Sequence, residues 1–236
     1  MKKIVFSLVT IAIIMSACVK TPDPIRFSIL GDSYSSLEGY VDPDTNDVYH
    51  YADIGVTGPE QMWWSQIANS TGWLLEKNNS FSGAMISNFD IMEFYVPASF
   101  IHRMDNLGHP DVIFILGGVN DLWNGAPFGD YVYSDWTEEQ LCCYRPALAY
   151  LFNSMKRLYP SSKLYFILET EPCPVAIDEE ARLNLIVSTH RIASHYDVEC
   201  IDLLGIHKNL WHPDVEGQKN IADQVWEYLA TENTSF

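Results

Sequence analysis

Short runs of apolar, often β-branched residues alternate along this chain with segments whose apolar residues recur at helical spacing. The run at 111–116 is uninterrupted, as in strands that are buried on both faces of a sheet. Further strands are predicted at 26–30, 74–77, 163–168 and 198–203. Helices are predicted at 61–70, at 138–158 with a bend or interruption near Pro146, at 178–195 and at 215–229. This alternation predicts an α/β fold, a three-layer α/β/α sandwich with a central, mostly parallel five-stranded sheet.

Two long polar segments, 40–59 and 124–136, do not fit the alternation and are rich in Gly, Pro, Asp and Tyr. Long loops in a compact domain are often functional. Ligands of an open parallel sheet bind beyond the carboxyl ends of its strands, where both segments are expected to begin. We therefore expect the two segments to form walls of a binding site.

The N-terminal segment has the pattern of an export signal. Lys2 and Lys3 precede an apolar run at 4–14 that is too short to span a membrane. The small residues directly before Cys18 resemble the lipobox of bacterial lipoproteins, which implies cleavage before Cys18 and its lipidation. An ordinary secretory signal with an incidental Cys is the alternative.

The expected product is an exported lipoprotein, anchored to a membrane through Cys18 on the periplasmic side or at the cell surface. The chain then divides into a signal peptide at 1–17, the lipidated Cys with a tether at 18–25, and a single domain at 26–236. Four cysteines lie in that domain, at 142, 143, 173 and 200. Adjacent cysteines rarely bridge each other, and a pairing of Cys142 or Cys143 with Cys173 stays open.

Charge and composition narrow the possible partners. The chain has 14 Lys and Arg residues against 31 Asp and Glu, a formal net charge of −17. Such a field repels phosphate backbones, so no nucleic-acid partner is expected. The 236 residues are 47% hydrophobic, which suffices for the core of one domain. Because CxxC and HExxH motifs are missing, no metal site is predicted.

Four residues on loops suggest chemistry. Ser33 follows the first strand in the motif GDSY, and a Ser hydroxyl needs a base before it acts as a nucleophile. Asn120, in GGVND after the buried strand, can donate from its side-chain amide into the same crevice. Gly83 follows the second strand and lets a backbone N–H approach a substrate oxygen. His212, before Pro213 and the last helix, is the usual type of base for such a Ser.

The order Ser, Gly, Asn, His on these loops resembles the SGNH hydrolases, also called GDSL esterases. The resemblance extends from residue 26 to about residue 229. It implies a hydrolase with Ser33 as nucleophile and His212 as base, without a cofactor. It also implies an oxyanion hole formed by Ser33, Gly83 and Asn120.

One position departs from the family pattern, which usually has Asp three residues before the His. Here that residue is Asn209, which cannot stabilise an imidazolium with a full charge. Three accounts stay open. We favour a Ser–His dyad with Asn209 or a backbone carbonyl orienting the ring. Alternatively, Asp202 or Asp214 supplies the carboxylate, or the protein is a slow, degraded enzyme.

Trp123 follows the oxyanion Asn and Trp211 precedes the base, so both are candidates for binding a sugar ring or an acyl chain. Packing into the core is the alternative for both, and core positions are expected for Trp63 and Trp64. The favoured function is a serine ester hydrolase that acts through an acyl-enzyme and removes small acyl groups, such as acetyl, from carbohydrate. The alternatives are a lysophospholipase or thioesterase, and a catalytically impaired glycan-binding protein.

Overall fold

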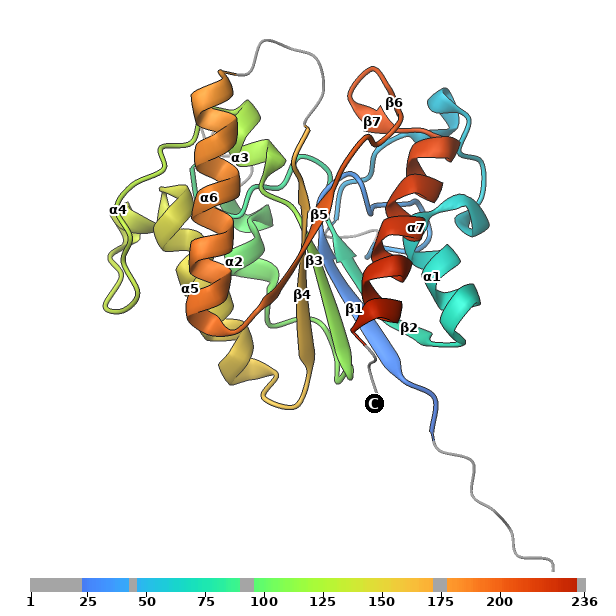
Figure 1. Cartoon of the computed structure of the whole chain (residues 1–236), viewed down its shortest axis with the longest axis horizontal. Helices are drawn as coiled ribbons and strands as arrows, with labels where there is room; N and C mark the ends of the chain where they lie inside the picture. Colours follow the sequence, from blue (N-terminus) through green and yellow to red (C-terminus); the bar gives the residue numbers. More distant parts are fainter. Residues whose placement is uncertain (1–22, 43–45, 90–95, 172–177, 233–236) are drawn as a thin grey trace, which may run out of the picture.

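The computed structural model describes residues 23–42, 46–89, 96–171 and 178–232. A five-stranded sheet of order β2-β1-β3-β4-β5 crosses its centre, and all neighbouring strands are parallel (Figure 1). The strands are β1 (Arg26–Gly31), β2 (Leu74–Ser80), β3 (Val112–Leu116), β4 (Lys163–Glu169) and β5 (Glu199–Leu203). The predicted three-layer α/β fold is confirmed.

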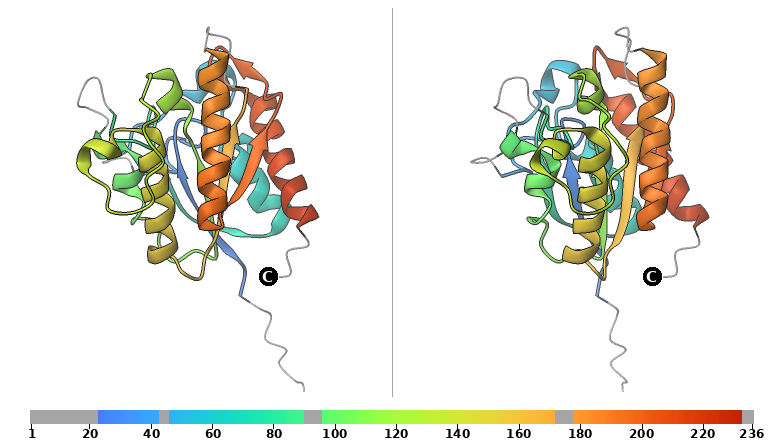
Figure 2. Two further views of the ribbon diagram at one scale, coloured as in Figure 1. Left: turned by 60° about the vertical axis from the view of Figure 1, so that its left-hand side comes forward. Right: turned by 90° about the vertical axis from the view of Figure 1, so that its left-hand side faces the viewer.

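Helices cover both faces of the sheet. They are α1 (Trp63–Thr71), α2 (Phe100–Arg103), α3 (Val119–Trp123), α4 (Glu138–Leu141), α5 (Tyr144–Leu158), α6 (Glu179–Tyr196) and α7 (Val215–Thr231), with 3₁₀ turns η1 (Tyr51–Ile54), η2 (Pro59–Gln61) and η3 (Val96–Ala98). Helices α2, α5 and α6 pack on one face, and α1 and α7 on the other. In the right-hand view of Figure 2, α5 and α6 lie in front of the sheet and α7 behind it.

The middle strand β3 shows why its sequence has no polar position. Ile113 and Ile115 pack into the α5–α6 side, whereas Val112, Phe114 and Leu116 pack into the α1–α7 side. All five side chains are at most 1% exposed. Successive residues of a strand point to opposite faces, so a strand covered on both sides is apolar throughout. Trp63 and Trp64 are also buried, as expected.

The predicted helix at 138–158 is two helices in the structure. α4 ends at Leu141 and α5 begins at Tyr144, with the backbone of Cys143 extended between them. Pro146 is the third residue of α5, where its missing N–H would have no partner within the helix. The interruption therefore precedes the proline instead of coinciding with it.

A short hairpin, β6 (Lys208–Asn209) with β7 (His212–Pro213), was not predicted. It lies against the start of α7 because Gly217 leaves room for the backbone: a Cβ there would come within 1.9 Å of the His207 carbonyl oxygen. Figures 1 and 2 show this hairpin beside the cyan segment around residues 50–60, at the end of the sheet where the strands finish. This end carries the predicted site residues.

Within the described ranges, no helix combines the length and apolarity that crossing a membrane requires. Cys18 and the expected signal peptide lie outside those ranges. Cys142, Cys143 and Cys200 are free thiols, and Cys173 lies outside the described residues, so its pairing stays open.

Candidate active site

Ser33 and His212, 179 residues apart in sequence, meet at the carboxyl end of β1. The Ser33 Oγ lies 3.0 Å from the His212 Nε2. Ser33 is 3% exposed and His212 is half-buried. His212 is placed there by the β6–β7 hairpin, whose turn puts Leu210 in the left-handed region at φ 58°. The contact has the geometry of a hydroxyl nucleophile beside its base.

The turn that carries Ser33 is held from several sides. The Asp32 carboxylate accepts a hydrogen bond from the Tyr34 amide at 2.9 Å, and the Tyr51 hydroxyl donates to the Ser33 carbonyl at 2.9 Å. Gly31 is required because a Cβ would lie 2.5 Å from the Ser80 Oγ. Burial raises the pKa of Asp32 to about 7, so this carboxyl takes up a proton near neutrality.

Asn120 and Gly83 come to the same place from two other loops. Gly118, at φ 100°, starts the short helix α3, and Asn120 Nδ2 donates to the Ala84 carbonyl at 3.0 Å and lies 3.5 Å from Asp32 Oδ2. Gly83 has φ 80°. Among the hydrogen bonds of the described residues, none is donated by the Ser33 or Gly83 amide. With respect to the residues that the structure describes, both amides are therefore available to donate to a ligand.

Two buried charged side chains that sequence reasoning missed support these loops. Asp121 accepts hydrogen bonds from the Ile86 and Ser87 amides and from the Ser87 hydroxyl, which fixes the loop after Gly83. Arg103 donates to the carbonyls of Gly31, Asn79 and Ala98 below the ends of β1 and β2. The sequence offered one signal for Asp121, its position directly after Asn120, and none for Arg103.

The imidazole of His212 lies among three tyrosines. The Tyr49 ring is stacked on it, with centroids 3.5 Å apart and planes at 17°. The rings of Tyr34 and Tyr51 are T-shaped to the imidazole, with centroids 5.8 Å and 6.4 Å from it. This burial lowers the pKa of His212 to about 4. The ring is therefore neutral at pH 7 and able to accept a proton.

The structure differs from the expectation that Asn209 orients this ring. Asn209 is exposed, and the buried Nδ1 of His212 has no hydrogen-bond partner within the described residues. Asp202 is bound to His190 at 3.0 Å and Asp214 to His207 at 2.9 Å. The hairpin pairs Asn209 with His212 along the backbone, but this pairing leaves the Asn209 side chain in solvent.

A family model for GDSL-like lipases and acylhydrolases matches residues 25–229 of this chain. The chain belongs to the GDSL-like lipase/acylhydrolase family. A structure described as a GDSL-like lipase from Bacteroides ovatus is 40% identical, with a TM-score of 0.80 over 89% of this chain and 99% of that one. Another, from Bacteroides uniformis, is 38% identical, with a TM-score of 0.78 over 89% and 97%.

A carbohydrate acetylesterase from Sinorhizobium meliloti shares the fold at 14% identity, with a TM-score of 0.61 over 88% of this chain and 99% of that one. No curated protein matches the chain. The resemblance inferred from the sequence is confirmed at the level of the family, and with it the enzyme class: the chain is a carboxylic ester hydrolase.

The two tryptophans beside the site of this acylhydrolase touch each other. Trp123 and Trp211 meet edge to face, with centroids 5.7 Å apart. Trp211 is 40% exposed, whereas Trp123 packs partly against the α1–α7 side of the core. The site therefore has one accessible indole next to His212, and the second indole supports it.

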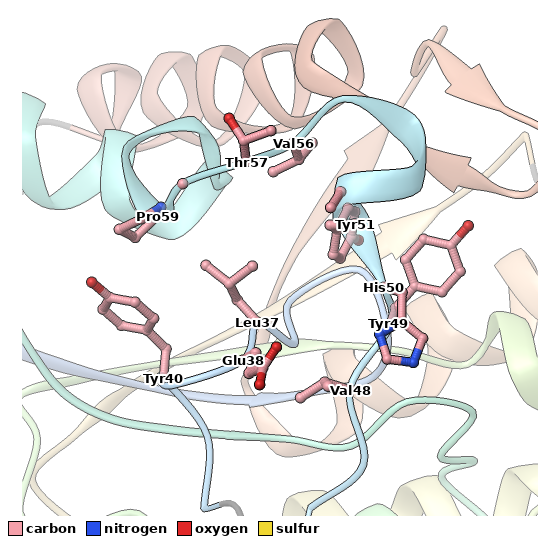
Figure 3. A pocket seen from close by; sticks show the side chains of 12 residues that line it. Leu37, Glu38, Tyr40, Val48, Tyr49, His50, Tyr51, Val56, Thr57 and Pro59 are labelled. Carbon is pink, nitrogen blue, oxygen red and sulfur yellow. The ribbon is translucent and has the colours of Figure 1, made fainter.

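The segment 40–59 adjoins the site of this acylhydrolase, as predicted. It supplies Tyr49 and Tyr51, and it lines a cavity of about 300 Å³ with Leu37 and Glu38 (Figure 3). The other predicted wall, 124–136, adjoins the site only at its start, where Asn124 Nδ2 donates to the Asn120 carbonyl at 2.8 Å. Its described aromatic contacts are with α5 and α6, including Tyr131 over Arg191 and Trp136 against Tyr150. Its aromatic residues add to the core instead, because they cover apolar surface between those helices.

Proposed function

We propose that Ser33 is the nucleophile and His212 the general base of a two-step acyl transfer. The observation that carries this proposal is the 3.0 Å contact between Ser33 Oγ and His212 Nε2. A neutral imidazole takes the hydroxyl proton as the oxygen attacks the ester carbonyl carbon. The imidazolium then gives that proton to the departing alkoxide, and water attacks the Ser33 ester by the same route to release the acid.

The oxyanion formed in both steps is held by the Ser33 and Gly83 amides and the Asn120 side chain. The two amides make no other hydrogen bond among the described residues. Asn120 uses one N–H for the Ala84 carbonyl, and its other N–H has only the 3.5 Å contact with Asp32. Each donor that meets the oxyanion is worth about 3 kcal/mol of transition-state stabilisation.

The substrate in this proposal is a carbohydrate ester with a small acyl group such as acetyl. In this proposal the sugar binds in the cavity beside Tyr49. Tyr40 supplies an aromatic ring to the lining of this cavity, and Glu38 and His50 supply polar groups. The exposed Trp211 offers a second aromatic surface near the base. The name of the Sinorhizobium meliloti acetylesterase, which shares the fold, agrees with this substrate class.

The proposal includes export and anchoring. Lys2 and Lys3, the apolar run at 4–14 and the small residues before Cys18 support cleavage before Cys18 and lipidation. Mass spectrometry of the protein from membranes tests this directly. A diacylated or triacylated N-terminal Cys18 is the expected result, and a mature N-terminus at another residue would contradict it.

The test of the catalytic roles is hydrolysis of p-nitrophenyl acetate, butyrate and octanoate by the chain from Thr21 onward. We expect Ser33→Ala and His212→Ala to lower kcat by at least about 10³-fold. Ser154→Ala, on α5 near the start of β4, is the matched control and should keep full activity. Equal rates in the parent chain and Ser33→Ala would contradict the mechanism.

Acetate release from acetylated oligosaccharides then tests the substrate class, with lysophospholipids and acyl thioesters as competitors. We expect the sugar acetates to give the highest kcat/KM, and Tyr40→Ala to raise KM for them while leaving p-nitrophenyl acetate hydrolysis unchanged. A tenfold or larger preference for long acyl chains would replace the sugar ester with a lipid or thioester. Saturable sugar binding without hydrolysis would identify a glycan-binding protein.

A further inference from the structure

We propose that Tyr49 is a positioning residue for the base: its ring holds His212 by stacking and so takes over the orienting task of the carboxylate that the family usually places at position 209. The inference rests on the proposed role of His212. It assigns a positioning role to a residue that lies outside the four sequence motifs, in the 40–59 segment.

The orienting task is not met by a hydrogen bond among the described residues. His212 Nδ1 is buried and has no partner there, Asn209 is exposed, and Asp214 is bound to His207. An imidazole held only through its Nε2 contact with Ser33 could still rotate about its side-chain bonds. Loss of the Ser33 contact through such rotation would remove the base from the nucleophile.

The Tyr49 ring restricts that rotation. Its centroid lies 3.5 Å from that of the imidazole and the two planes differ by 17°, so the rings are in van der Waals contact over their faces. A change in the tilt of His212 would drive its edge into the tyrosine ring. The T-shaped contacts with the rings of Tyr34 and Tyr51 limit movement in other directions. Together the three rings define the plane in which Nε2 points at Ser33.

Tyr49 is itself held in place by groups connected to the nucleophile turn. Its amide donates to the Ser36 hydroxyl at 3.1 Å, and its ring meets Tyr51 edge to face at 4.9 Å. The Tyr51 hydroxyl donates to the Ser33 carbonyl and accepts from Gln218 Nε2 at 3.2 Å. The half-buried Tyr49 is therefore anchored to buried side chains that also hold the nucleophile turn.

The stack also suits the charge that appears during turnover. When His212 takes the Ser33 proton, its ring becomes an imidazolium facing the electron-rich face of a phenol ring. A cation over an aromatic face is stabilised, and the effect increases where water is excluded. A tyrosine can in this way favour the charged intermediate without forming a hydrogen bond.

The experiment compares Tyr49→Phe and Tyr49→Leu with the parent chain, measuring kcat and KM for p-nitrophenyl acetate and the inactivation rate by a small fluorophosphonate. The inactivation rate reports on activation of Ser33 without a bound sugar. We expect Tyr49→Phe to stay within about threefold of the parent. Tyr49→Leu should lower kcat and the inactivation rate together by about 10- to 100-fold, with KM changed less than threefold.

Tyr133→Leu is the matched control, since it removes another tyrosine–histidine stack, the one on His195 at 4.0 Å and 25°, away from the site. It should leave all three quantities unchanged. Should Tyr49→Leu fail to fold by circular dichroism, Tyr49→Gln replaces it with a non-aromatic side chain of similar reach.

Three results would overturn the inference: parent-like kcat in the non-aromatic variant, a loss confined to KM, or equal losses in Tyr49→Phe and the non-aromatic variant. A parent chain no faster than Ser33→Ala would instead overturn the proposed function, and the inference with it. The two failures are therefore distinguished by the parent and Ser33→Ala rates alone.

Discussion

At the scale of single residues, burial sets the protonation of the site. The same loss of water lowers the pKa of His212 to about 4 and raises those of Asp32 to about 7 and Asp121 to about 6. Both effects favour the uncharged forms. The His212 imidazole is therefore uncharged at neutral pH, and the buried carboxyls are more easily protonated than their exposed counterparts.

The pH dependence of activity follows from the lowered pKa of His212. A base that is protonated only near pH 4 stays active well below the ordinary histidine value of about 6.5. We expect kcat/KM to be flat from pH 8 down to about 5 and to fall below that. Steady-state rates with p-nitrophenyl acetate, beside circular dichroism to verify folding at each pH, measure this. An acid limb centred near 6.5 would contradict it.

Substitutions at Asn209 distinguish the two ways of holding the base. Asn209 is exposed, and His212 Nδ1 has no hydrogen-bond partner among the described residues, so Asn209→Ala should change kcat less than threefold. Asn209→Asp should raise kcat severalfold and shift the acid limb to higher pH, because it lies opposite His212 in the hairpin and offers Nδ1 a charged acceptor. A tenfold loss in Asn209→Ala would mean that Asn209 orients the base in solution.

At the scale of elements, the hairpin β6–β7 carries His212 on only two residue pairs. A buried ion pair between Lys208 Nζ and Glu169 Oε2, at 2.9 Å, attaches the hairpin to the end of β4. Lys208 also donates to the Glu171 carbonyl at 3.0 Å, and the Glu171 side chain accepts from the Gly205 amide. The end of β4 therefore positions the base through charge.

Removing that ion pair should affect stability and catalysis together. Lys208→Met leaves Glu169 buried without its partner, and we expect a loss of about 2–4 kcal/mol in the free energy of unfolding and a lower kcat. Lys219→Met, which removes an exposed pair with Asp223, is the control and should cost less than about 1 kcal/mol. Urea unfolding and kcat measure both. Equal effects of the two substitutions would contradict a role for the buried pair.

At the scale of the whole molecule, the formal charge of −17 and the buried carboxyls both make the folded state more stable as the pH is lowered from 8. A folded-state pKa of about 7 for Asp32, against about 3.8 in the unfolded chain, means that the folded state binds more protons below pH 7. Stability therefore rises as pH falls through 7. The lowered pKa of His212 has the opposite effect, but only below about 6.5.

Between pH 8 and 6.5 the carboxyl effect therefore outweighs that of His212, and the raised pKa of the exposed His207 adds to the carboxyl effect in the same sense. We expect the Tm to increase as pH is lowered over this interval. Asp32→Asn should remove most of the increase, because an amide does not titrate. Differential scanning calorimetry measures it. A Tm that falls from pH 8 to 6.5 in the parent chain would contradict the expectation.

Hydrophobic patterning was sufficient to predict the layers of this molecule. Strands buried on both faces and helices with one apolar face are local properties, so β3, α1 and α7 were predictable within a few residues. The interruption near Pro146 was also predicted, and it lies just before α5 because a proline is tolerated in the first turn of a helix. The family and its motifs also depend on short segments, which explains why the family could be inferred, and Ser33, Gly83, Asn120 and His212 proposed as site residues, without coordinates.

The side chains that surround these four residues could not be predicted from short sequence segments. Tyr49 and His212 are 163 positions apart, and nothing in the composition of the 40–59 segment says which of its tyrosines meets the base. The same holds for Arg103 below β1 and for Lys208 against Glu169. Local sequence specifies which elements form and which motifs they carry. Contacts between distant segments depend on how all the elements pack at once, and here that packing stacks the Tyr49 ring on the face of His212 and leaves the His212 Nδ1 without a hydrogen-bond partner among the described residues.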